Sequence, residues 1–180
     1  HVLLAVCASV CTASVVKISN VEPRRDTQGN ILNVHDGGLY FFESQWVLVG
    51  TSYFHCQSFT NCSSHIGDCG WQDNNFSAYT APSPQGPWTL ASNNLIPNRP
   101  AGGANFRPKL LASSSGGNTT YVMWFNYQPP TPNIPGYLVV ATSLKPTGPF
   151  TIVNEKVAVK KPLNGDFALF RDDDGTAYIA

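Results

Sequence analysis

The sequence has few charged residues and no excess of either sign. Only 12% of its 180 residues are charged, and 11 Lys and Arg balance 11 Asp and Glu. A soluble domain averages about 25% charged residues. A neutral chain lacks the basic surplus that binding to nucleic acid or to an anionic membrane requires. We therefore expect neither of these partners, and we expect a monomer.

Long hydrophobic runs are also absent. The longest apolar run, residues 2–16, is shorter than the roughly 20 residues that a bilayer span needs. Its length and its small residues are typical of the apolar region and cleavage zone of a signal peptide. Alternatively, its two halves, VLLAV and SVVKI, are strands of a sheet. We predict that residues 1–16 are part of a signal peptide and that the protein is secreted.

Cysteine is scarce, with 5 residues in the chain. Cys7 and Cys11 lie in the predicted signal peptide, and the other three lie in one segment rich in polar residues. A disulfide between two of these three is the favoured interpretation, although the sequence does not say which two. Free thiols are an alternative, as is a metal site, but the spacing matches no common zinc pattern. The three are Cys56, Cys62 and Cys69.

Helical periodicity is nearly absent, and short aromatic and β-branched runs recur instead. Clusters of Gly, Pro, Asn and Ser separate them, which is typical of an all-β protein. The predicted strands are 38–42, 45–50, 76–80, 87–91, 107–112, 120–126, 137–142, 149–153, 166–170 and 176–180.

The order of these segments repeats along the chain. A strand pair followed by a small-residue strand (SAYTA) and the turn SPQGPW is echoed by a second pair, the strand VVATS and the turn SLKPTGPF. A third unit begins at Asp166. Four-stranded units that repeat along the chain predict a β-propeller. A β-sandwich would not explain the paired turns.

Three incomplete blades cannot close a ring, and the last segment, TAYIA, reads as a strand that has only begun. We therefore expect residues 17–180 to be the N-terminal part of a longer propeller domain. The run Asp172, Asp173 and Asp174 before Gly175 reads as a solvated hairpin turn rather than a metal site.

Three stretches of this repeat resemble the family 43 glycoside hydrolases. They are VHDGG (Val34–Gly38) with LYFFESQWVLVGTSY, FRPK (Phe106–Lys109) with YVMWF, and GDF (Gly165–Phe167) with ALFRDDDGTAYIA. With RRDTQGN (Arg24–Asn30), they are most similar to the exo-β-1,3-galactanase branch. The resemblance implies a five-bladed β-propeller, of which about the first three blades lie in this chain.

The resemblance also implies an inverting hydrolysis, in which one carboxyl group activates water and a second protonates the leaving oxygen. It assigns the general base to Asp36, which would otherwise read as an Asp-Gly turn residue. It assigns to Asp166 the third family carboxylate, which raises the pKa of the general acid and orients it. The acid itself is a Glu from a later blade. Glu43 and Glu155 read as surface residues, so we expect the acid to lie beyond residue 180.

Four further residues are candidates for binding the sugar. His35 is a potential hydrogen-bond partner of a sugar hydroxyl, and Arg107 of substrate or of a neighbouring carboxylate. Phe106 and Trp124 are aromatic platforms for a sugar face, although Trp124 also alternates like a core residue. The galactanase branch usually has Glu where this chain has Phe106 and Gly where it has Asp36, so the substrate stays open.

The sequence therefore predicts a secreted glycosidase acting on β-linked galactan or a related plant or microbial polysaccharide. No organic cofactor is implied, and neither a metal site nor a structural calcium ion is indicated. The first alternative is a carbohydrate-binding propeller that has lost catalysis, and the second is a purely structural extracellular propeller.

Overall fold

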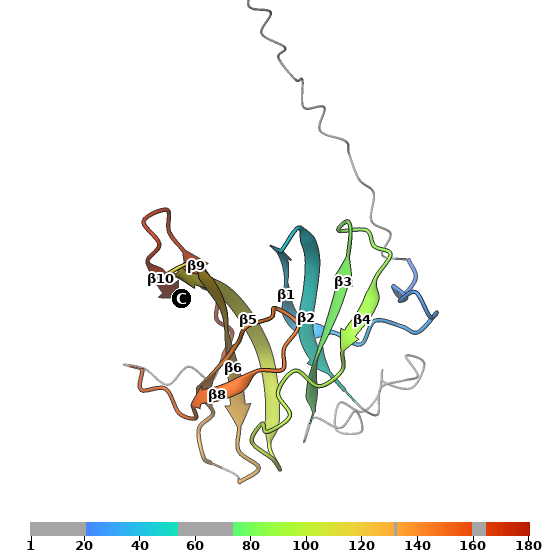
Figure 1. The fold of residues 1–180 in the computed structure, drawn as a ribbon. Coiled ribbons are helices and arrows are strands. Elements are labelled where there is room, and N and C mark those ends of the chain that lie inside the picture. Colours follow the sequence, from blue (N-terminus) through green and yellow to red (C-terminus); the bar gives the residue numbers. More distant parts are fainter. Residues whose placement is uncertain (1–20, 54–73, 132, 160–164) are drawn as a thin grey trace, which may run out of the picture.

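The computed structural model describes residues 21–53, 74–131, 133–159 and 165–180, and this part of the chain is all-β (Figure 1). The first sheet holds β1 (His35–Phe42), β2 (Gln45–Ser52), β3 (Asn75–Ala81) and β4 (Thr89–Ser92) in that order. The second holds β5 (Ala104–Ser115), β6 (Asn118–Gln128), β7 (Tyr137–Ser143) and β8 (Thr151–Asn154). A hairpin follows, formed by β9 (Leu169–Arg171) and β10 (Ala177–Ile179).

The two four-stranded sheets confirm the repeat that the sequence predicted. In both, every strand pairs antiparallel with the next one along the chain. Matching turns precede β4 and β8, closed by a hydrogen bond from Gly86 N to Ser83 O (3.0 Å) and from Gly148 N to Lys145 O (3.1 Å). The number of blades in the complete ring stays a prediction.

Three strands begin two or three residues later than predicted. β4 and β8 begin at Thr89 and Thr151 rather than at Pro87 and Pro149, because proline has no N–H with which to pair in a sheet. The strand predicted over 166–170 begins at Leu169. Asp166 therefore lies in the segment that leads into β9 rather than in the strand itself.

The main core lies between the two four-stranded sheets. Alternate residues of β6 (Tyr121, Met123 and Phe125) point into it, and the ring of Phe125 meets the ring of Phe76 edge-on, with centroids 5.1 Å apart. This alternation is what a strand with one buried face requires. The other fully or nearly buried members are Val47, Val49, Ala78, Leu95, Ile96, Leu110, Tyr127, Val139, Ala141 and Phe150.

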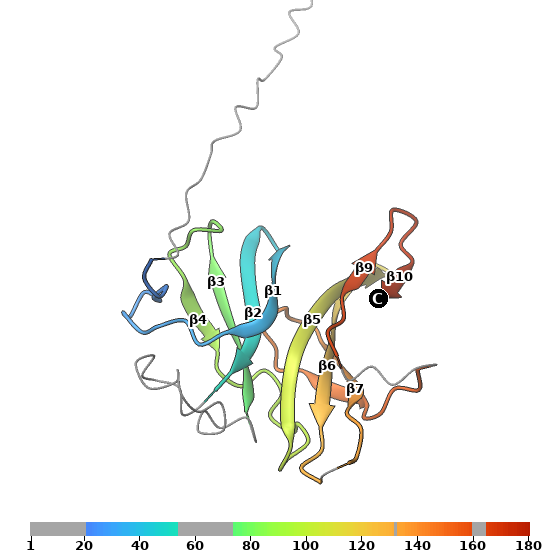
Figure 2. The same ribbon diagram turned by 180° about the vertical axis from the view of Figure 1, so that it is seen from behind.

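The first strands of the three units lie next to one another. β5 contacts β1 on one side and β9 on the other, and both views of the ribbon show this order (Figures 1 and 2). Residues at the starts of β1 and β5 and before β9 are therefore brought to one region. No helix in the described ranges is long and apolar enough to cross a membrane.

A hydrogen bond joins the β1–β2 turn to the second sheet. Tyr121 Oη, on a side chain only 2% exposed, donates to Glu43 Oε1 over 2.9 Å. Burial and the neighbouring carboxylate raise the pKa of Tyr121 to about 12. Glu43 is exposed, as predicted, but it also holds this turn in place.

We expect Tyr121→Phe to lower the free energy of unfolding by about 1.5 kcal/mol, because the bond to a charged acceptor is lost. Urea denaturation of the two proteins measures the difference. Tyr178→Phe is the control, because Tyr178 is 50% exposed and its replacement should change little. Equal stability of Tyr121→Phe and the wild type would show that the bond contributes nothing.

Candidate active site

Matching β-bulges interrupt β1 and β5 close to their starts. In the first, Asp36 and Gly37 stand opposite the single residue Gly50, between the pairs His35–Thr51 and Gly38–Val49. In the second, Arg107 and Pro108 interrupt the register between the pairs Phe106–Asn126 and Lys109–Trp124. A bulge turns a side chain away from the regular alternation and is common next to active sites.

The first residue of each bulge has a left-handed backbone. The φ angle is 54° at Asp36 and 57° at Arg107, a region that few residues other than glycine adopt. Asp36 and Arg107 thus occupy equivalent positions in two successive units. The Asp36 side chain is exposed, so its carboxylate is open to water.

Arg107 joins the second unit to the third. Its Nε lies 2.5 Å from Asp166 Oδ1, and the side chains are 27% and 92% exposed. The guanidinium also lies over the ring of Phe106, with Cζ 4.8 Å from the ring centroid. Of the two roles predicted for Arg107, this geometry agrees with pairing to a neighbouring carboxylate.

Lys109, two residues further along β5, reaches back to the first bulge. Its Nζ donates hydrogen bonds to Asp36 O (3.0 Å) and Gly37 O (2.7 Å). Burial lowers the pKa of Lys109, while the carboxylates of Asp36 and Asp166 oppose this change. Two residues of β5 therefore contact the two predicted acids: the Arg107 side chain pairs with the Asp166 carboxylate, and the Lys109 side chain donates to the Asp36 backbone.

Asparagine side chains hold the backbone around these residues. Asn33 forms two hydrogen bonds with the backbone of Tyr53, at 2.9 Å and 3.0 Å. Asn74 does the same for Asn105, the residue before Phe106. Asn126 Nδ2 donates to Gly165 O, the residue before Asp166, over 3.3 Å. Asn74 and Asn126 thus fix the residues that directly precede Phe106 and Asp166, two of the predicted site residues.

No family model and no curated protein sequence matches the chain, but solved structures do. A GH43 β-1,3-galactosidase matches with a TM-score of 0.69 at 20% identity, over 90% of this chain and 32% of its own. The exo-β-1,3-galactanase of Phanerochaete chrysosporium, solved with galactose, matches with a TM-score of 0.66 at 24% identity, over 90% of this chain and 35% of its own. The exo-β-1,3-galactanase of Clostridium thermocellum matches with a TM-score of 0.65 at 22% identity, over 90% of this chain and 34% of its own.

The chain has the GH43 fold. This structural likeness at low identity agrees with the resemblance seen in the sequence. The matching structures include exo-β-1,3-galactanases. The chain spans only about a third of the length of these three structures. A GH43 β-xylosidase/α-arabinofuranosidase solved with xylotriose matches less well, with a TM-score of 0.56.

The predicted binding residues do not all lie in the same part of this fold. His35, Phe106 and Arg107 are half-buried and lie at or beside the two bulges. Trp124 pairs with Lys109 in the register of β5 and β6 and alternates with Met123 and Phe125, so it lies on the sheet face away from the main core. Trp124 is also half-buried.

Sequence reasoning did not single out Lys109, Asn74 or Asn126. A signal was present for Asn126, a polar residue inside the apolar strand YVMWFNY, because a buried amide needs a hydrogen-bond partner. Asn74 is likewise fully buried. For Lys109, the R-P-K motif was visible, but nothing in it shows that the side chain crosses to β1.

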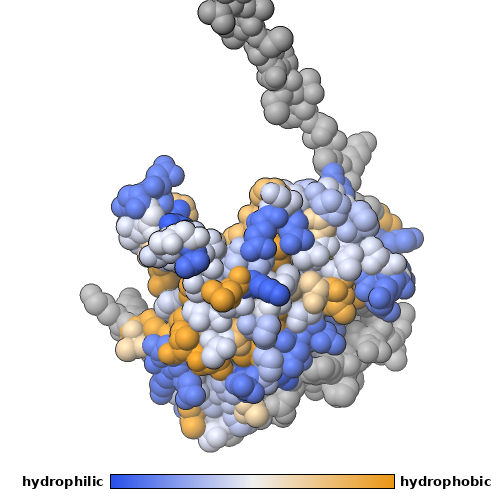
Figure 3. All heavy atoms as spheres, in the orientation of Figure 1, coloured by the Kyte–Doolittle hydropathy of each residue, from blue (hydrophilic) through white to orange (hydrophobic). Residues whose placement is uncertain are grey.

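Other acidic residues lie elsewhere. Asp172 and Asp174 close the β9–β10 hairpin: Gly175 N donates to Asp172 O, and Thr176 N donates to Asp174 Oδ1. This agrees with the predicted hairpin turn, and the hairpin ends in hydrophilic residues at the upper left of Figure 3. Among the described residues no group of three or more His, Cys, Asp or Glu could hold a metal ion.

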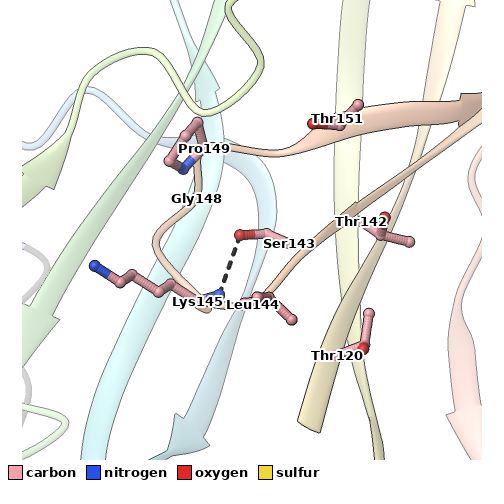
Figure 4. Close-up of a pocket in the computed structure, with 8 residues that line it drawn as sticks. All are labelled: Thr120, Thr142, Ser143, Leu144, Lys145, Gly148, Pro149 and Thr151. Carbon is pink, nitrogen blue, oxygen red and sulfur yellow. Dashed lines mark hydrogen bonds between the residues drawn. The ribbon is translucent and has the colours of Figure 1, made fainter. Parts of the chain in front are cut away.

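A hollow lies on the second sheet, away from the bulges (Figure 4). Thr120 of β6, Thr142 of β7 and Thr151 of β8 line it together with the turn after β7. In that turn Lys145 N donates to Ser143 Oγ over 3.1 Å. None of the predicted site residues lines this hollow. Cys56, Cys62, Cys69 and residues 1–16 lie outside the described residues, so the disulfide and the signal peptide stay predictions.

The environment of His35 should make the stability of the protein depend on pH. Its ring lies 5.1 Å from the ring of Tyr53, and burial lowers its pKa below 6.5 despite the nearby Asp36. The unfolded chain therefore binds this proton more readily than the folded one. The resulting stability is present in full above pH 6.5 and is lost as the pH falls below that value.

We expect the melting temperature of the wild type to fall more steeply than that of His35→Gln between about pH 7 and pH 5. Calorimetry of both proteins over this range measures the two slopes. Equal slopes would show that His35 titrates alike in the folded and unfolded states.

Proposed function

We propose that this chain is part of a secreted glycoside hydrolase that cleaves β-linked galactan, or a related polysaccharide, with inversion at the anomeric carbon. Asp36 is the general base that activates water. Asp166 orients the general acid and raises its pKa. The acid itself is a Glu from a part of the GH43 propeller beyond residue 180. The propeller has five blades and acts as a monomer.

The observation that carries this proposal is the arrangement of Asp36 and Asp166 on either side of β5. The two acids come from different units of a GH43 fold, and β5 contacts both, through Lys109 at the Asp36 backbone and through Arg107 at Asp166. Inversion needs carboxyl groups about 6.5–9.5 Å apart, so that a water molecule fits beside the sugar. In this proposal that pair is Asp36 and the Glu beyond residue 180, while Asp166, in the segment before β9, acts on the acid.

Galactan is the favoured substrate because the neighbours include exo-β-1,3-galactanases. One of these structures holds galactose, and mutants of the same enzyme were solved with β-1,3-galactotriose. Arabinan and xylan are the next candidates, since another GH43 neighbour is a β-xylosidase/α-arabinofuranosidase.

A carbohydrate-binding propeller without catalysis is the second candidate. Half-buried Phe106 beside the second bulge offers an apolar platform rather than a carboxylate.

Incubation of the complete protein with galactan, arabinan and xylan oligosaccharides separates the two candidates. Chromatography of the products measures cleavage, and calorimetry measures binding. Cleavage of one class supports the hydrolase and identifies its substrate. Binding without cleavage supports the binding propeller. The absence of both binding and cleavage would reject both candidates.

A further inference from the structure

The contact between Lys109 and the first bulge connects two units through a single ammonium group. Both acceptors are backbone carbonyls of consecutive residues, Asp36 O at 3.0 Å and Gly37 O at 2.7 Å. An ammonium group has three hydrogens to donate, so this contact occupies two of them. The lysine is half-buried, and its bond to Gly37 O is partly shielded from competition with water.

The bulge needs such support because its backbone is unfavourable. Asp36 has a φ of 54°, and in this region an L-residue brings its Cβ close to the following carbonyl oxygen. A bulge also removes its extra residue from the regular ladder of hydrogen bonds. Donors from another part of the fold then replace the missing ladder bonds.

The backbone next to Lys109 is itself held against β1. The next residue, Leu110, donates its backbone N–H to Tyr40 Oη over 3.0 Å, and the Leu110 side chain is 1% exposed in the main core. The lysine therefore extends from a rigid anchor, and its head group defines where the two carbonyls of the bulge can lie.

We propose that Lys109 is a positioning residue: by holding the carbonyl groups of Asp36 and Gly37, it fixes the direction in which the Asp36 carboxylate points. This inference rests on the proposed function of Asp36 as the base. Lys109 acts through the backbone of the bulge and contributes no proton to the reaction. It is distinct from Arg107, which contacts Asp166 directly.

The first test compares Lys109→Met with the wild-type complete protein on the oligosaccharide that it cleaves. Methionine keeps most of the side-chain volume and removes the donors. We expect kcat to fall about 100-fold, the scale of a displacement of about 1 Å in a reacting group, with little change in KM. Lys109→Arg keeps the charge and should recover part of the loss. Lys145→Met is the control, because Lys145 is exposed in the turn after β7, and it should match the wild type.

A double variant separates positioning from a general loss of structure. If Lys109 acts only through Asp36, then Asp36→Asn with Lys109→Met should be no slower than Asp36→Asn alone. Effects of residues that act as one unit are not additive. Additive losses, or an unchanged kcat in Lys109→Met, would overturn the inference.

A third readout does not depend on hydrolysis. Nuclear magnetic resonance of the backbone carbonyl carbons reports their hydrogen bonds, so the signals of residues 36 and 37 should shift in Lys109→Met and stay unchanged in Lys145→Met. If the wild type cleaves nothing, the proposed function fails, but this measurement still decides whether Lys109 holds the bulge. Unchanged carbonyl signals would overturn the inference on their own.

Discussion

Replacing Asp36 with asparagine is expected to lower kcat/KM for glycoside hydrolysis about 10³-fold or more while leaving the fold intact. Asparagine cannot accept the proton of the attacking water, and general base catalysis is worth about 10²–10⁴-fold. The fold should tolerate the change, because the side chain is exposed and asparagine adopts the left-handed region at φ 54° more readily than most residues.

Steady-state kinetics on the cleaved oligosaccharide measure this loss, and thermal melting checks the fold. Asp173→Asn is the matched control, since Asp173 is an exposed aspartate at the tip of the β9–β10 hairpin. It should keep full activity. An Asp36→Asn protein as active as the wild type would remove Asp36 from the mechanism.

Replacing Gly37 with alanine is expected to disrupt the start of the first sheet. A Cβ on Gly37 would lie 1.6 Å from the carbonyl oxygen of Val49 on β2, so the backbone of β1 or β2 must move. We expect a loss of about 3 kcal/mol or more in the free energy of unfolding, at the upper end of overpacking effects. In a domain of about 150–250 residues this corresponds to a melting temperature lower by roughly 6–12 °C, and the shift is smaller in a longer protein.

Gly165→Ala is the control for that variant. Gly165 also lies beside a predicted site residue, but a Cβ there meets nothing within 4 Å, so its melting temperature should stay close to that of the wild type. Activity should also fall in Gly37→Ala, because the bulge carries Asp36. A Gly37→Ala protein with unchanged stability and activity would mean that the bulge has a different shape in solution.

The repeat was the part of the fold that could be read from the sequence. Short aromatic and β-branched runs such as WVLV and YVMWF, separated by clusters of Gly, Pro, Asn and Ser, predicted the strands. The paired Gly-Pro turns then aligned one sheet with the next. Strand starts were less predictable, because the missing N–H of Pro87 and Pro149 shortened β4 and β8.

The candidate site was predictable as residue types but not as geometry. Asp36 stood out before Gly37 and Gly38, and Arg107 stood out in the R-P-K motif. That both are the first residues of equivalent bulges could not be read, because a bulge depends on the register of a strand with its partner. Contacts such as Lys109 with Asp36, or Asn74 with Asn105, join residues 73 and 31 positions apart and follow only from the packing of two sheets.

The stereochemistry of the released sugar tests the account most directly. Proton nuclear magnetic resonance can follow the first minutes of cleavage of β-1,3-galactotriose by the complete protein, before the anomers of the product equilibrate. Water activated by Asp36 attacks from the face opposite the leaving group, so the account predicts that α-galactose appears first. Initial release of β-galactose, or the absence of any cleavage of this or another β-linked oligosaccharide, would contradict it.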